Sequence, residues 1–351
     1  MYFPNFTITN KILKNIGLIE ACREVIINAP LVPAWEAKFR EEAIIRTVHY
    51  GTHIEGNELN LTQAVRVMEG KAVLARERDI QEVINYRNVL NYIDGLQKKD
   101  KDFKITESII KHLHKLTVEK ILPKEECGEY RTKKVVIKNS QTGEITFAPP
   151  PFIEVPYLLE SFINWLGGPP AKDLHPVLKA GIIHYELARV HPFLDGNGRV
   201  ARAAAIMALF REGYDVKRFF SLEEHYDRDA IGYYGALKSA ESGDLTLWLE
   251  YFIEGLAQEL AKIKEKVQNL SVDLKLKEKM GGRQVALTSR QIKILEYIQG
   301  AGFLQNKAFK DLFPMISEDS VLRDLQDLIK KGILKKTGVT KASKYVLKTT
   351  L

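Results

Sequence analysis

The sequence predicts a mainly α-helical protein that carries one β-hairpin and a separate, smaller domain towards its C-terminal end. Apolar residues recur at helical spacing through most of residues 33–280, and a short alternating run interrupts them at 130–150. A glycine pair, Gly281-Gly282, then ends a charged helical stretch and indicates a linker. The 351 residues suffice for two or three domains, and strands do not alternate with helices as they would around a parallel sheet.

The composition excludes several classes of protein. With 45% hydrophobic and 28% charged residues, the chain is neither disordered nor collagen-like. Two cysteines, Cys22 and Cys127, cannot build a disulfide-rich fold or a four-cysteine zinc site. The sequence has no run of about 18 apolar residues that would span a membrane. Its first residues lack the apolar core of a signal peptide, so we expect a cytoplasmic protein.

The positive charge is concentrated in the last quarter of the chain. Residues 261–351 hold 19 Lys+Arg and 9 Asp+Glu, a net charge of +10, whereas residues 1–260 carry a net charge of −3. This asymmetry indicates a separate basic module and suggests nucleic acid as its partner.

Helix signals follow one another along the N-terminal part. The first segment has Trp35, Phe39, Ala43 and Val48 on one face, and Pro33 suits the first helical turn. By the same spacing, helices are expected at about 33–48, 61–69, 77–97, 106–119, 155–167, 175–190, 197–212, 228–241 and 245–280.

The segment 130–150 predicts a β-hairpin. Val135 and Ile137 alternate with polar residues, a polar turn follows at 141–143, and Ile145 and Phe147 form the second run. An exposed strand edge can pair with an extended peptide, although an ordinary solvent-exposed hairpin would give the same pattern.

The C-terminal segment predicts three helices, at 287–298, 305–313 and 317–331, followed by two short strands around a basic turn. This order resembles a winged helix-turn-helix, whose third helix would enter a DNA major groove while lysines of the wing contact phosphate. A protein-binding winged helix is the alternative, because Asp319, Asp324 and Asp327 of the third helix repel phosphate.

The chemistry is carried by residues 191–202, His-Pro-Phe-Leu-Asp-Gly-Asn-Gly-Arg-Val-Ala-Arg, which lie between two helical patterns. The glycines let the backbone approach a ligand, and amides at a helix N-terminus bind anions. Arg199 and Arg202 share one helix face and suit phosphate oxygens. Asp195 is a hard oxygen ligand for Mg²⁺, and His191 can act as a general base. Together they predict a phosphoryl- or nucleotidyl-transfer site. A plain helical corner with surface arginines would explain neither the histidine nor the aspartate.

At every fixed position this segment resembles the Fic-family signature His-Pro-Phe-x-Asp/Glu-Gly-Asn-Gly-Arg-x-x-Arg, and residues 36–250 resemble a Fic core with its preceding helical region. The resemblance implies a Fic-fold helical bundle with a flap at 130–150. It also implies an enzyme that transfers AMP from ATP to a Tyr, Thr or Ser hydroxyl of a target protein bound along that flap, with release of pyrophosphate.

The resemblance assigns a role to each residue of the motif. His191 would take the proton from the target hydroxyl, and Asp195 would bind Mg²⁺ between the α- and β-phosphates. The phosphates would be held by the amides of Gly196, Asn197 and Gly198, by Arg199 at the β-phosphate and by Arg202 at the γ-phosphate.

A second segment, Gly51-Thr-His-Ile-Glu-Gly-Asn57, resembles the inhibitory motif of Fic proteins, Ser/Thr-x-x-x-Glu-Gly/Asn. Glu55, followed by Gly56, would then pair with Arg202 and force ATP into a non-productive pose. The sequence departs from the motif at Gly51, where Ser or Thr is expected. A helix that simply ends in Gly-Asn with a solvated glutamate is the alternative.

Tyr233 and Tyr234 resemble the family's Tyr-Tyr-x-Ala-Leu segment near the adenine, where an aromatic ring could stack on the base. Packing in the core is the alternative for each ring. Three further histidines are expected on helix faces or in the core: His112, His114 and His184.

The expected organisation is an N-terminal helical region with the inhibitory helix at 1–104, a catalytic core at 105–260, a helical linker at 261–285 and a winged helix at 286–351. The main hypothesis is an auto-inhibited protein adenylyltransferase that uses ATP and Mg²⁺. Alternatives are a DNA-binding regulator whose Fic-like part senses nucleotide, and a Fic enzyme that removes AMP or transfers another phosphate-containing group. Helical proteins of this family often pair, so a homodimer is also open.

Overall fold

The structure is a computed structural model that describes residues 2–29, 31, 33–100, 102–138, 145–269, 287–314, 316–338 and 343–348. The chain divides into two compact units. The larger contains Met1–Ile27 and Arg40–Lys264, and the smaller contains Asn28–Phe39 and Glu265–Leu351. Each unit is described by itself below.

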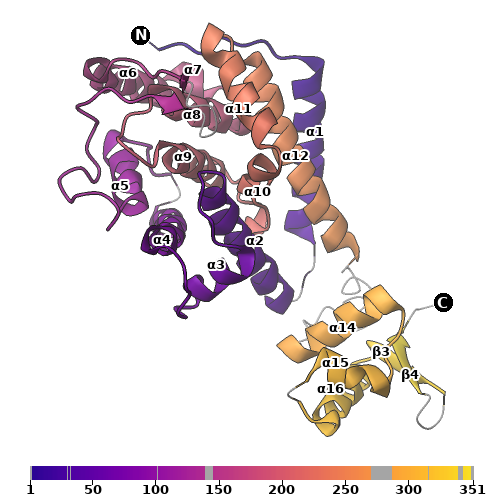
Figure 1. Cartoon of the computed structure of the whole chain (residues 1–351). Helices are drawn as coiled ribbons and strands as arrows, with labels where there is room; N and C mark the ends of the chain where they lie inside the picture. Colours follow the sequence, from indigo (N-terminus) through magenta and orange to yellow (C-terminus); the bar gives the residue numbers. More distant parts are fainter. Residues whose placement is uncertain are drawn as a thin grey trace. The chain divides into compact units, whose positions relative to one another are not determined.

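The larger unit is a bundle of helices, as the sequence predicts (Figure 1). The helices that lie wholly or mostly in it are α1 (Asn10–Asn28), α2 (Pro33–His53), α3 (Leu61–Met68), α4 (Glu77–Lys99), α5 (Glu107–Thr117), α6 (Val155–Gly167), α7 (Pro169–Lys172), α8 (Pro176–Val190), α9 (Asn197–Arg211), α10 (Leu222–Arg228), α11 (Ala230–Ser239) and α12 (Thr246–Asn269). Sequence patterning missed α1, α7 and α10. The expected helix at 228–241 instead begins after Asp229, whose side chain accepts a hydrogen bond from the amide of Gly232 and caps α11.

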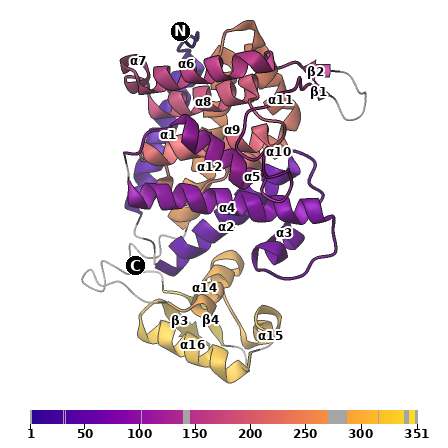
Figure 2. The same ribbon diagram turned by 90° about the vertical axis from the view of Figure 1, so that its left-hand side faces the viewer.

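Helix α9 lies in the middle of this unit. It packs along α8, while α4 and α5 lie beside it (Figure 2). Nearly every residue of α9 is buried, and its many alanines leave room for neighbouring helices to approach closely. The residues that precede and begin α9 are therefore fixed from several sides, which suits a site that must hold its geometry.

The predicted hairpin is present as β1 (Ile137–Lys138) and β2 (Ile145–Phe147), which pair antiparallel with Ile137 opposite Phe147. Figure 2 shows the two strands at the edge of the bundle. The turn predicted at 141–143 lies outside the described residues, as does the linker predicted at Gly281-Gly282.

The smaller unit contains α14 (Ser289–Ala301), α15 (Phe309–Leu312), α16 (Glu318–Lys330), β3 (Leu334–Thr337) and β4 (Lys344–Leu347). Three helices followed by a two-stranded antiparallel sheet is the order that the sequence predicts. Thr288 and Gln291 form a capping box at the start of α14, where each side chain accepts a hydrogen bond from the other residue's backbone. The core of the unit holds one apolar face from each long helix: Ile292, Leu295, Ile298, Val321, Leu325 and Leu328.

Two of the three acidic residues expected to repel phosphate are paired within the unit. Asp324 is buried and pairs with Arg290 of α14. Asp327 accepts a hydrogen bond from Gln291 and pairs with Lys331. Their charges are therefore balanced locally, because cationic and polar side chains of the same unit surround them.

Within the described part of the chain, the helices are too short or too polar for any of them to traverse a lipid bilayer.

Candidate active site

The site begins where α8 ends. His191 follows Val190 and adopts the left-handed conformation, with φ of 50°, which breaks the helix before Pro192. Its ring Nδ1 lies 3.3 Å from the carbonyl oxygen of Ala188. A carbonyl can only accept, so this contact places the proton on Nδ1 and leaves Nε2 as the basic nitrogen.

The loop between His191 and α9 is held by its own side chains. The Asn197 amide group accepts a hydrogen bond from the Phe193 amide and donates one to the Phe193 carbonyl, each at 2.8 Å. Gly196 has φ of 72°, and a Cβ there would stand 3.0 Å from side-chain atoms of Thr117 and Val118. Glycine is therefore required at 196 both for its backbone conformation and for the space around it.

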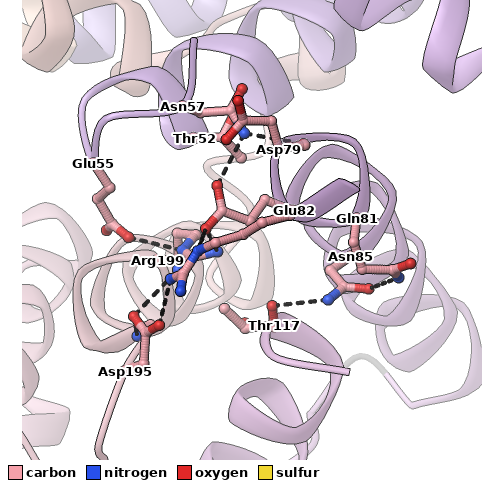
Figure 3. A network of polar contacts seen from close by, with 12 residues as sticks. Thr52, Glu55, Asn57, Asp79, Gln81, Glu82, Asn85, Thr117, Asp195 and Arg199 are labelled. Atoms are coloured by element: carbon pink, nitrogen blue, oxygen red, sulfur yellow. Dashed lines mark hydrogen bonds and ion pairs between the residues drawn. The ribbon is translucent and has the colours of Figure 1, made fainter. Parts of the chain in front are cut away.

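Arg199 and Arg202 are both almost fully buried, and both bind Glu55. Figure 3 shows the contact between Glu55 and Arg199. Glu55 Oε2 lies 2.7 Å from Arg199 Nε, and Glu55 Oε1 lies 2.7 Å from Arg202 Nη2. The sequence led us to expect the pair with Arg202. The structure adds Arg199, so one carboxylate engages both guanidinium groups at the start of α9.

Glu55 reaches the arginines from the turn that ends α2. Gly56 has φ of 93°, which lets the chain reverse directly after the glutamate. The carboxylate rests against Gly198, where a Cβ would stand 2.3 Å from Oε1. Burial acts to raise the pKa of Glu55, but the charges of Arg199 and Arg202 and their hydrogen bonds outweigh it. The pKa is lowered, and Glu55 stays ionised at neutral pH.

Asp195 precedes the glycine and is already paired. Its Oδ1 accepts a 2.6 Å hydrogen bond from the Gly196 amide, and its Oδ2 lies 2.5 Å from Nη2 of Arg78 on α4. Burial acts to raise the pKa of Asp195, but Arg199, Arg78 and the Gly196 amide lower it overall. The carboxylate is therefore ionised and able to serve as a metal ligand.

The residues fit a magnesium ion that is shared with phosphates. Among the described residues, no group of three or more His, Cys, Asp or Glu side chains could form a protein cage for a metal. Mg²⁺ is commonly bound through one or two carboxylates together with substrate phosphates and water, and the ionised Asp195 offers one such carboxylate.

His191 is neutral in this arrangement. Burial lowers its pKa to about 4, although the hydrogen bond to Ala188 and the carboxylates of Glu55 and Asp195 act in the opposite direction. A neutral imidazole with Nε2 unprotonated can accept a proton from an incoming hydroxyl at physiological pH.

The two tyrosines differ in burial and in their partners. Tyr233 is buried: its hydroxyl lies 2.9 Å from His184 Nε2 and its ring stacks on Tyr226. It is a core residue and has no open face for an adenine. Tyr234 is about half exposed, and its hydroxyl donates to the carbonyl of Ile54, next to Glu55. Stacking on a base stays a prediction, and Tyr234 has the more exposed ring of the two.

Sequence reasoning missed Arg131, which lies at the base of the hairpin. This buried side chain donates hydrogen bonds to the carbonyls of His191 (2.8 Å) and Pro150 (2.6 Å), while its backbone amide donates to Pro192. It therefore ties both ends of the flap to the backbone of the expected base. A lone arginine in a lysine-rich strand gave no signal that it would be buried.

His114 also supports the loop. It was expected as a helix-face or core residue, and it is buried, with its ring stacked on Phe193 at 3.8 Å. Its Nδ1 accepts a hydrogen bond from the Gly128 amide, so its Nε2 carries the proton and donates to the carbonyl of Asp195 at 3.2 Å. Burial lowers the pKa of His114 to about 4, and the ring stays neutral.

The match to a known family coincides with this site. Residues 104–209, which contain α5, the hairpin, α8, the loop and α9, match the model of the Fic/DOC family. The chain contains a Fic domain. Glu55 precedes the matched segment, and Tyr234 follows it, so the site draws on residues outside the Fic domain as well as within it.

Curated proteins similar to the chain are named for the same domain. A protein adenylyltransferase Fic from Culex quinquefasciatus is 28% identical over 273 residues, covering 77% of this chain and 52% of that protein. One from Drosophila melanogaster is 30% identical over 219 residues, covering 61% and 41%. The chain thus spans about half the length of the curated relatives it matches.

Solved structures share the fold of the Fic domain and its surroundings. A Fic family protein from Desulfovibrio desulfuricans G20 aligns over 99% of both chains, with a TM-score of 0.67 and 23% identity. Residues 134–508 of Fic-1 from C. elegans cover 75% of this chain, with a TM-score of 0.59 and 24% identity. At these identities the likeness concerns the fold alone.

Proposed function

We propose that the chain is an auto-inhibited protein adenylyltransferase that transfers AMP from ATP to a Tyr, Thr or Ser hydroxyl of a target protein. The observation that carries the proposal is the Glu55 carboxylate between Arg199 and Arg202. Two buried guanidinium groups hold oxygens of one anion at the start of a helix, as a phosphate site requires. The names of the curated relatives agree with this activity.

In the proposed reaction, the hydroxyl oxygen of the target forms a bond to the α-phosphorus of ATP. The bond from that phosphorus to the bridging oxygen of the β-phosphate breaks, and pyrophosphate leaves with the electron pair. Nε2 of His191 accepts the hydroxyl proton, since Nδ1 already carries the other ring proton. Asp195 would hold Mg²⁺, which neutralises phosphate charge when bound.

Inhibition follows from the same contact. While Glu55 occupies Arg199 and Arg202, neither guanidinium group is available to the β- and γ-phosphates. The carboxylate would also repel phosphate oxygens, because like charges at short range are unfavourable. Glu55 is part of the same chain, so the inhibition is intramolecular.

The target is proposed to bind along the flap at 130–150, in extended form beside β1 and β2. Arg131 would hold the segment that follows β2 near His191, because its side chain donates to the carbonyls of Pro150 and His191. A homodimer remains a further prediction, which measurement of the mass in solution would test.

Transfer of label from α-labelled ATP tests the function. With Mg²⁺ and a cell lysate, Glu55→Gly should transfer more label than wild type, and adding His191→Ala should reduce transfer at least about a hundredfold. His112→Ala is a matched control, because His112 is exposed and packs beside Tyr92. Equal labelling with and without His191 would contradict the proposal.

Further arms separate the alternatives. Labelling from γ-labelled ATP would indicate phosphate transfer, and labelling from α-labelled UTP would indicate UMP transfer. Release of AMP from a previously modified target would indicate the reverse reaction.

A DNA-binding role for the smaller unit is the second candidate function. Arg323, Gln326 and Lys330 are exposed at positions of α16 that share one face. Lys335 and Lys336 of β3, Lys344 of β4 and Lys348, directly after β4, are also exposed. Asp324 and Asp327 are paired with Arg290 and Lys331, whereas Asp319 is exposed on the same face as Arg323.

Binding of the full chain to duplex DNA at several salt concentrations tests this role. Lys335→Glu with Lys336→Glu should weaken binding about tenfold or more and reduce the salt dependence, whereas Lys14→Glu on α1 should change neither. No binding at low salt, or equal binding by both variants, would indicate that the unit does not bind DNA.

A further inference from the structure

Arg78 connects α4 to the expected metal ligand. It lies in the first turn of α4, and its side chain reaches Asp195, 117 residues further along the chain. Nη2 of Arg78 lies 2.5 Å from Asp195 Oδ2, and its Nε donates to Glu82 Oε1 at 3.1 Å. The guanidinium group is therefore held between two carboxylates, one of which belongs to the anion loop.

The carboxylate of Asp195 has a donor on each oxygen. Oδ2 accepts a hydrogen bond from Arg78. Oδ1 accepts one from the amide of Gly196 and lies 3.5 Å from Nη2 of Arg199. A divalent cation that uses a carboxylate oxygen of Asp195 must compete with these donors. Arg78 is the partner that can leave, since the amide of Gly196 belongs to the backbone of the loop and Arg199 is buried.

We propose that Arg78 is a counter-ion that competes with divalent cations for Asp195 and so forms a second inhibitory contact beside that of Glu55. The inference rests on the proposed function only in taking Asp195 as the metal ligand. It concerns binding of the cation and not transfer of AMP.

The two inhibitory contacts belong to one network. Glu82 lies on the turn of α4 that follows Arg78; its Oε1 is 3.4 Å from Arg199 Nη1, and its Oε2 accepts a hydrogen bond from Asn57 at 2.9 Å. Asn57 stands two residues after Glu55, and Arg199 binds Glu55 directly. Figure 3 shows these side chains converging from α4, from the segment after α2 and from the start of α9. The cation site at Asp195 and the Glu55 contact are therefore expected to influence each other, and any such coupling acts equally in both directions.

The strength of the contact is moderate. The side chain of Arg78 is 56% exposed, whereas that of Asp195 is 31% exposed. Solvent and salt screen such a pair, so its removal should change the affinity for the cation by a few-fold to about tenfold rather than by orders of magnitude. With an effect of this size, the divalent cation can displace Arg78 from Asp195 at the concentrations used in an ordinary binding experiment.

Titration of the full chain with Mn²⁺ tests the proposal, with free Mn²⁺ measured by electron paramagnetic resonance. Wild type is compared with Arg78→Ala and Arg78→Gln, and Asp195→Asn reports Mn²⁺ bound elsewhere. Arg66→Ala is the matched control: Arg66 is an exposed arginine on α3 that donates to the carbonyl of Ala72. Thermal unfolding of each variant confirms that it folds.

We expect Arg78→Ala and Arg78→Gln to bind Mn²⁺ about three- to tenfold more tightly than wild type and Arg66→Ala, and Asp195→Asn to lose this site. Equal affinity in wild type and both Arg78 variants, weaker affinity in these variants, or no binding that depends on Asp195 would each overturn the proposal. The titration measures Mn²⁺ binding and not AMP transfer. Its result therefore does not depend on whether the chain adenylylates a target.

Discussion

The ring of Tyr86 on α4 lies directly over Gly51 on α2, where a Cβ would stand 2.4 Å from Tyr86 Cε1. Tyr86 is fully buried, and its hydroxyl donates to Glu223 at 2.9 Å. The carbonyl of Gly51 accepts a 2.8 Å hydrogen bond from Arg202. At the position where the inhibitory motif that this segment resembles has Ser or Thr, the ring of Tyr86 thus leaves room for glycine only. Thr52, the next residue, does not replace it, since its hydroxyl donates to carbonyls of its own helix.

Gly51→Ser should therefore destabilise the larger unit. The new Cβ forces the buried ring of Tyr86 to move, and its bond to Glu223 is lost. We expect the free energy of unfolding to fall by about 1–3 kcal/mol, as for other overpacked cores. Chemical denaturation measures this change.

Gly95→Ala is the control for that measurement. Gly95 lies on α4, the helix that carries Tyr86, and a Cβ added at Gly95 would have no atom within 4 Å. Alanine there should raise the free energy of unfolding by about 0.5–1 kcal/mol, because glycine is a poor helix residue. If Gly51→Ser is as stable as wild type, the close contact with Tyr86 does not restrict this position.

Removal of Glu55 should lower stability and make it depend on nucleotide. Glu55→Gly leaves the buried Arg199 and Arg202 without their shared anion. Since Glu55 itself is partly exposed, we expect a loss of about 1–3 kcal/mol rather than the full cost of breaking a buried pair. Thermal unfolding with and without ATP and Mg²⁺ should show a larger stabilisation by nucleotide in Glu55→Gly than in wild type. The control is Glu58→Ala, an exposed glutamate three residues along, which should behave as wild type.

Stability should fall as the pH is lowered from about 6.5 towards 4. Burial lowers the pKa of His114 to about 4 in the folded chain, whereas an unfolded histidine titrates near 6.5. Between these values the unfolded state binds more protons, so each unit of pH reduces the free energy of unfolding by up to about 1.4 kcal/mol per such histidine. His114→Gln should show a smaller loss between pH 7 and pH 5 in urea denaturation. A slope equal to that of wild type would mean that His114 is not buried as a neutral ring.

Arg131 should act as a positioning residue. Arg131→Lys removes the planar fork that donates to His191 and Pro150, so the backbone at the base and the flap lose their common support. In the Glu55→Gly background we expect kcat/KM for the protein target to fall about 10- to 100-fold, while the affinity for ATP changes less than twofold. Calorimetric titration with ATP and steady-state kinetics with target separate the two effects. A fall in ATP affinity as large as the fall in kcat/KM would indicate general damage to the fold.

Much of the fold could be predicted from the sequence because its signals are local. Helices such as α4 and α6 show their apolar faces directly, and the hairpin shows its alternation and its polar turn. Helix α10 was missed because it is short and merges with the pattern of α11. Helix α1 was missed because its apolar residues are spread around the helix, and much of its surface remains exposed.

The candidate site also contains residues that could be predicted from the sequence and residues that could not. His191, Asp195, Arg199 and Arg202 lie within one stretch of twelve residues, so their chemistry and spacing were readable from the sequence. The environment of Tyr233 could not be predicted from the sequence, because whether an aromatic ring faces the core or a ligand depends on which rings pack against it.

The sequence by itself predicted an anion-binding loop at the start of a helix, with a candidate base before it and two arginines after it. Only the tertiary structure decided that Glu55 engages both arginines, that Arg78 holds Asp195, and that Arg131 joins the flap to His191. The reason is separation along the chain: Glu55 and Arg202 are 147 residues apart, and Arg78 and Asp195 are 117 apart. Their approach depends on how α2, α4 and α9 pack, and that packing is set by the whole core.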